Sequence, residues 1–180
     1  MLMEFNSRTK TPDFDMRDYQ DIPQQLRDVV KLIEGFNVTF LYDDAYKLIE
    51  RMRAREITKL YPLIALTGWS ETEESNTQLS VTLDQLIIAS ATDVKYYSEQ
   101  RDKYHFKPIL VPIQNEFERR LINSGYYLFS DNCTGIEYAS RRREMFFGND
   151  SQHEGASPID AVVYEGISLT INKSLTLKKL

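Results

Sequence analysis

The chain has few of the residues on which redox, metal and phosphate chemistry depend. Its single cysteine, Cys133, excludes an intrachain disulfide, and its two histidines leave no Cys/His spacing typical of a zinc site. Its seven glycines form neither GxGxxG nor GxxxxGKS/T, the patterns that cradle phosphates. We therefore expect neither a cofactor nor a bound metal.

Long hydrophobic runs are also missing. No apolar segment approaches the ~20 residues that a helix needs to cross a bilayer. The first residues lack the basic start and the apolar stretch of a signal peptide. We expect a protein that stays in the cytoplasm or is assembled there into something larger, without contact to a membrane.

Positive charge is in deficit. The 22 Lys and Arg residues against 27 Asp and Glu give a net charge of −5 and a pI near 5.2. A protein that coats nucleic acid needs an excess of cations to bind phosphates, so this class is disfavoured. A protein that DNA passes without being held is not excluded. The 11 Tyr and 9 Phe suit a β-rich core and protein interfaces.

Hydrophobic periodicity predicts an α+β fold, with a small mixed or antiparallel sheet packed against two or three helices. The clearest strand is 78–84, where polar and apolar residues alternate. The alternation shifts phase beyond Asp84, which suggests a bulge or a change from one-sided to two-sided burial. Further strands are expected at 37–42, 61–66, 126–129 and 159–171, the last interrupted at Gly166. Helices are expected at 22–34 and from Asp43 or Asp44 to Met52, with two more at 98–123 separated by Pro108.

The polar segments give the domain organisation. Residues 1–20 are predicted to form an N-terminal arm, residues 21–171 a single domain, and residues 172–180 a short C-terminal tail. Within the domain, 130–158 reads as a long irregular loop. Arm and loop both have the composition of segments that become ordered on a partner.

Three side chains are candidates for chemistry. His105 has the side chain of a general base, and Cys133 is a candidate nucleophile that His105 would activate. His153, with Asp150 or Glu154, is a candidate metal ligand. The sequence supplies no orienting carboxylate and no flanking signature for any of them, so a structural role is favoured for each.

Two charged stretches are candidate surfaces. Arg141, Arg142 and Arg143, followed by Met145, Phe146 and Phe147, have the composition of an interface strip, although a solvated face or a nucleic-acid contact stays open. Residues 61–94 contain no Lys or Arg, while Glu71, Glu73 and Glu74 lie in a segment that we expect at the tip of a hairpin between 61–66 and 78–90. That tip is interpreted as a solvated loop, as the lining of a channel that repels DNA phosphates, or as an outer partner contact.

The stretch from Tyr61 to Pro112 resembles virion proteins of tailed phages and prophages that infect Bacteroidetes, crAss-like phages included. The residues that carry the resemblance are Tyr61, Pro62, Leu63, Ile64, Thr92, Asp93, Tyr97, Ser98, Gln100, Arg101, Phe106, Lys107, Pro108, Ile109, Leu110 and Pro112. A late family motif is matched by Asn149, Asp150, Asp160, Ala161 and Val162. The resemblance covers about residues 60–170 and departs in the long 130–158 loop, where the family has a shorter connection.

The resemblance implies a tail-terminator-like fold and no enzymatic activity. It implies a structural protein that forms a ring at the head–tail connector or neck of the virion, beside the portal and other neck or tail proteins. DNA would pass through that ring without specific binding. Two alternatives stay open: a small cytoplasmic enzyme or ligand-binding domain that uses His105 and Cys133, and an adaptor that binds one partner through residues 141–147 without forming a ring.

Overall fold

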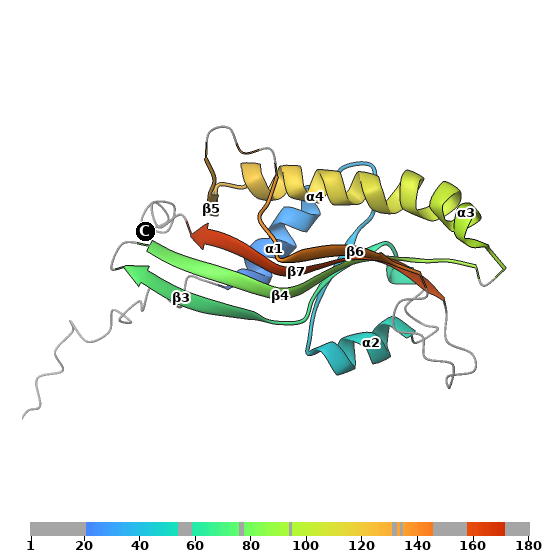
Figure 1. The fold of residues 1–180 in the computed structure, drawn as a ribbon, viewed down its shortest axis with the longest axis horizontal. Helices are drawn as coiled ribbons and strands as arrows, with labels where there is room; N and C mark the ends of the chain where they lie inside the picture. Colours follow the sequence, from blue (N-terminus) through green and yellow to red (C-terminus); the bar gives the residue numbers. More distant parts are fainter. Residues whose placement is uncertain are drawn as a thin grey trace, which may run out of the picture.

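The computed structural model describes residues 21–53, 59–75, 78–93, 95–130, 133, 135–145 and 158–171. Within them, one mixed sheet of seven strands, curled as a half-barrel, carries helices on both faces (Figure 1). The predicted α+β class is confirmed. The predicted arm and tail lie outside the described residues.

The elements follow one another in this order along the chain: α1 (Ile22–Lys31), β1 (Thr39–Tyr42), α2 (Ala45–Arg53), β2 (Leu63–Leu66), β3 (Trp69–Ser75), β4 (Gln78–Ala91), α3 (Ser98–Arg101), the π-helix η4 (Asp102–Leu110), α4 (Val111–Asn123), β5 (Tyr127–Leu128), β6 (Ser140–Glu144) and β7 (Ile159–Ile171).

The two longest strands, β4 and β7, form the antiparallel centre of the sheet, from the pair Ser80 and Thr170 to the pair Ala91 and Ile159. The outer side of β4 pairs with β3 along its first half and with β2 along its second half. The outer side of β7 pairs with β5 and β6, and β1 extends the sheet as a parallel neighbour of β2. Short strands therefore flank a long central pair on both sides.

The predicted phase shift in β4 is confirmed, and β7 shares it. Up to Leu83 the odd-numbered residues of β4 face the larger core, whereas from Leu86 the even-numbered ones do. The exchange in β7 falls at Gly166, whose φ is 62°, so the predicted interruption is a local twist in a continuous strand. Beyond this point Ile87 and other residues of the opposite face form a second core with α2. One half of the sheet is therefore buried on both faces.

The prediction that a helix ends or kinks at Pro108 is wrong. The elements α3, η4 and α4 follow one another without a break and run across the sheet as one rod (Figure 1). Pro108 lies inside η4, where the hydrogen bonds skip one residue more than in an α-helix. The wider turn accommodates the proline ring, which an α-helix would drive against the preceding turn.

Ile113, Phe117 and Leu121 form the buried stripe of α4. Gln114 on the same helix is buried as well, and the carboxylate of Glu118 accepts a hydrogen bond from the hydroxyl of Tyr164. The reason is that β6, which the sequence analysis placed in an irregular loop, is a strand whose Arg141 reaches this side of the helix.

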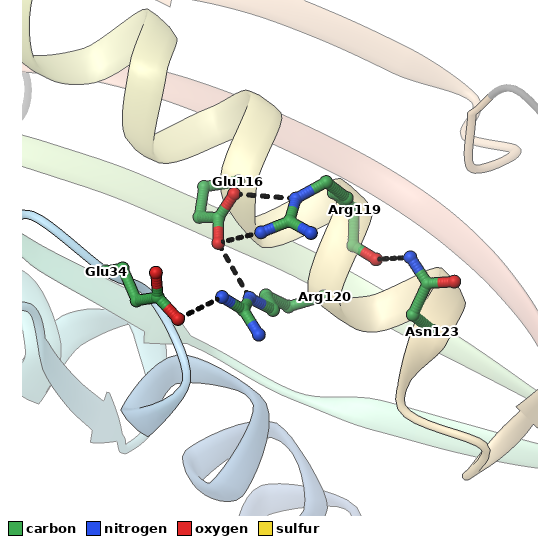
Figure 2. Close-up of polar contacts among 5 residues, drawn as sticks. All are labelled: Glu34, Glu116, Arg119, Arg120 and Asn123. Atoms are coloured by element: carbon green, nitrogen blue, oxygen red, sulfur yellow. Dashed lines mark hydrogen bonds and ion pairs between the residues drawn. The ribbon is translucent and has the colours of Figure 1, made fainter.

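An ion network joins α4 to the segment after α1. Figure 2 shows Arg120 between two carboxylates: its Nε lies 2.7 Å from Oε1 of Glu116, four residues earlier in α4, and its Nη2 lies 2.8 Å from Glu34 Oε1. Arg119 binds Glu116 through two nitrogens, at 2.6 and 2.8 Å. The hydrogen bonds from Arg119 and Arg120 lower the pKa of Glu116 from 4.5 to about 2.

We expect Gly166→Ala to destabilise the protein by about 1–2 kcal/mol, because a side chain disfavours positive φ. The added Cβ would also lie 3.0 Å from the Cβ of Ala139. Urea unfolding measures the loss. The matched control is Gly135→Ala, whose nearest neighbour would be 4.0 Å away. Equal midpoints for the two variants would contradict the strained geometry.

The Glu116 network predicts a dependence of stability on pH. Because the folded pKa of Glu116 is depressed, its contribution is complete above about pH 4.5 and is lost as the pH falls toward about 2. We expect Glu116→Gln to lower the free energy of unfolding by about 1 kcal/mol or less at pH 7 and to have no effect near pH 2. Glu50→Gln, an exposed change in α2, is the control. A difference that persists unchanged at low pH would contradict this assignment.

Candidate functional site

The predicted interface strip is part of an edge strand and not of a loop. Arg141, Arg142 and Arg143 lie in β6, which pairs with β7 from Ser140 opposite Glu165 to Glu144 opposite Ala161. The sequence analysis missed this strand because three consecutive arginines do not show the alternation of a half-buried strand. Met145 follows the strand and is 40% exposed. Phe146 and Phe147 lie outside the described residues.

All three arginines make contacts within the chain. Arg142 pairs with Glu144 and, at 2.6 Å, with Glu165. Arg143 lies 3.1 Å from Asp102 on η4 and stacks over the ring of Phe106.

Arg141 reaches Glu118 at 3.6 Å and lies over the rings of Tyr138 and Tyr164. The strip therefore fastens β6 to β7 and to the helical rod. The three side chains remain 40–52% exposed, which leaves part of each surface open.

The acidic segment is also a strand. Glu71, Glu73 and Glu74 belong to β3, so the expected loop is wrong, although β2 and β4 pair antiparallel as predicted. On one side β3 pairs with β4; among the described residues no strand pairs with its other side. Glu71 is half-buried opposite Val81, and no Lys or Arg of the described part of the chain pairs with it. This outer edge of β3 is acidic and open.

A buried ion pair holds the other end of the molecule together. Arg101 is 1% exposed and Asp160 is fully buried, and Arg101 Nη1 lies 2.6 Å from Asp160 Oδ1. The remaining nitrogens of Arg101 donate to two backbone carbonyls, Nε to Tyr96 and Nη2 to Asp93, each at 2.9 Å. Asp93, Arg101 and Asp160 are residues that carry the family resemblance, and the fold brings them into one cluster.

His105 borders this cluster. Its ring lies 5.6 Å from that of Tyr96, and burial lowers its pKa, an effect that the nearby Asp160 carboxylate partly opposes. His105 is therefore neutral at pH 7. The Asp160 carboxylate is bound by Arg101, so it does not orient the imidazole as a catalytic aspartate would.

The structure does not bring His105 and Cys133 together. The thiol of Cys133 donates to the carbonyl of Gly135 and borders a shallow hollow with Asn115 and Asn123 of α4. His105 is ten residues before Asn115 on the same rod, which corresponds to roughly 15 Å. The Cys–His pair required by the enzyme alternative is therefore not formed. His153 lies outside the described residues.

The described residues contain no group of three or more His, Cys, Asp or Glu side chains placed to hold a metal ion. None of their helices is both long and apolar enough to cross a membrane. The features that stand out are thus two charged edge strands, β3 and β6, and the buried ion pair between Arg101 and Asp160.

No protein-family model matches the chain, and no curated protein matches it.

The buried pair predicts a large asymmetry between single and double substitutions. Arg101→Met leaves the Asp160 carboxylate buried without its cation, which we expect to cost about 3–5 kcal/mol in urea unfolding. Adding Asp160→Leu should recover much of this loss, because no isolated charge then remains. The control is Arg143→Met, which removes an exposed pair and should cost about 1 kcal/mol or less. If Arg101→Met costs no more than Arg143→Met, the pair does not hold this corner.

Proposed function

We propose that this protein is a non-enzymatic structural subunit of a tailed-phage virion that assembles into a ring at the head–tail connector or neck, in a tail-terminator or connector role. The observation that carries the proposal is the pair of unlike edge strands, acidic β3 and basic β6, on opposite sides of the central pair of β4 and β7. A subunit with two different contact surfaces on opposite sides repeats one heterologous contact with each added copy.

The location in a virion rests on the sequence resemblance. Two residues that carry it, Arg101 and Asp160, meet in the buried pair, and the exposed Asp93 contributes its backbone carbonyl. The motif therefore has a physical reason to be kept in proteins that share this corner of the fold. It supports a common architecture and not a common reaction, because Arg101 is almost fully buried and its three side-chain nitrogens all donate to groups of the same chain.

We expect native mass measurement of the purified protein to show a closed oligomer of one stoichiometry, either alone or with candidate neck partners. Electron microscopy of that species should show a ring with an axial opening. In particles purified from the virus that encodes the chain, quantitative mass spectrometry should find it at the copy number of one ring. A protein that stays monomeric with every neck partner, or that is absent from purified particles, would refute the proposal.

A further inference from the structure

The open edge of β3 has the properties of a binding site for an added strand. It belongs to a strand that pairs with β4 from Trp69 opposite Leu83 to Ser75 opposite Gln78, while no described strand covers its other side. An edge strand exposes unpaired N–H and C=O groups, and an extended segment can bind them by continuing the sheet. The edge also carries Glu71, Glu73 and Glu74 within a stretch, 61–94, that has no Lys or Arg.

The C-terminal tail, residues 172–180, has the complementary properties. Its sequence, NKSLTLKKL, contains Lys173, Lys178 and Lys179 and no acidic residue. Ser174, Leu175, Thr176 and Leu177 alternate polar and apolar, the pattern of a strand with one buried face. Three cations on a strand-like segment match three carboxylates on an open strand.

Other occupants fit less well. A second copy of β3 would place the glutamates of two chains against each other, and like charges on neighbouring strands are destabilising. The arginines of β6 are already bound to Glu118, Glu144, Glu165 and Asp102. The tail carries three lysines and no acidic residue, so it brings no like charge to the glutamates of β3.

The direction of β7 favours a tail from another copy. Both β3 and β7 are antiparallel to β4, so they run parallel to each other, and their arrows point to the same end of the sheet in Figure 1. A chain that continues beyond Ile171 in the direction of β7 therefore moves away from its own β3 and must reverse to reach it. A neighbouring copy whose β3 edge lies beyond that end of the sheet would be reached without such a reversal.

We propose that residues 172–180 of one copy bind the outer edge of β3 in the next copy as an added strand. This inference rests on the proposed ring, because it names the contact that each subunit repeats. It assigns Glu71, Glu73 and Glu74 to a contact between subunits and not to a channel lining. The tail links each copy to the next one, and the glutamates of β3 receive its lysines.

A cross-linking experiment tests the contact directly. In a Cys133→Ser background, one chain carries Thr72→Cys on β3, and a second chain of different size carries Thr176→Cys in the tail. The two are co-expressed and oxidised in the assembled state. We expect a disulfide-linked pair of one large and one small chain. The matched control replaces Thr72→Cys by Lys47→Cys, a cysteine on the exposed side of α2, and should give no such pair.

The outcomes separate the inference from the proposed function. The tail cysteine is placed in turn at Ser174, Thr176 and Lys178. If the ring forms and none of these positions gives the cross-link, the tail contact is refuted and the proposed ring still stands. A disulfide that forms only when both cysteines are on one chain shows that the tail binds its own β3 and also refutes the inference. A protein that never assembles refutes both.

A charge exchange gives an independent test. Changing Lys173, Lys178 and Lys179 to Glu should weaken self-association by about tenfold or more, as should changing Glu71, Glu73 and Glu74 to Lys. Combining both sets should restore assembly, because the attraction is then re-formed with the signs exchanged. If the variant with Glu71, Glu73 and Glu74 changed to Lys assembles normally and impairs only genome packaging or ejection, the three glutamates line the channel and the inference is wrong.

Discussion

The buried pair between Arg101 and Asp160 constrains the whole corner where the helical rod meets the sheet. An isolated carboxylate costs several kcal/mol to bury, and Asp160 Oδ2 has no hydrogen-bond partner among the described residues. Displacement of Arg101 would leave the Asp160 carboxylate buried without its cation, so the position of Arg101 is fixed. Because the same guanidinium also binds the carbonyls of Asp93 and Tyr96, it fixes the turn that leads from β4 into α3. The path of the rod across the sheet follows from that turn.

The position of the rod in turn places the β6 edge. Asp102, one residue after Arg101, binds Arg143, and Glu118, four turns further along, is reached by Arg141. The strand β6 is thus held by its hydrogen bonds to β7 on one side and by contacts with the rod on its helix-facing side. A change at Arg101 would be transmitted to this edge through the rod. The π-helical segment that contains Pro108 lies between the two anchor points.

The elements predicted correctly are those whose sequence carries a complete local signal. The alternation in 78–84 identifies β4, the phase shift beyond Asp84 identifies the exchange of faces, and Asp44 accepts a hydrogen bond from the N–H of Lys47 as a helix cap does. The strands β3 and β6 were missed because edge strands need not bury alternate residues. Their polar sequences read as turns or loops until the pairing with β4 and β7 is known.

The same distinction applies to the candidate sites. Runs of like charge are visible in the sequence, and both were identified there. Their roles depend on contacts across the fold, such as that between Arg142 and Glu165, which no spacing in the sequence reveals. The cluster of Arg101, Asp160 and His105 likewise joins residues 59 positions apart. The resemblance had marked Arg101 and Asp160 without giving the physical reason for them.

The two edges differ in a way that bears on symmetry. A twofold dimer places the same surface on both partners, and at β3 this would bring glutamates against glutamates. Contacts between unlike surfaces avoid that repulsion, and they produce either a closed ring or an open filament, depending on the rotation at each step. The sheet is curled, so its outer edges face different directions. Copies joined edge to edge, as in the proposed ring, would therefore be rotated relative to one another. This geometry favours a curved array, and the arginines of β6, already neutralised within the chain, do not oppose it.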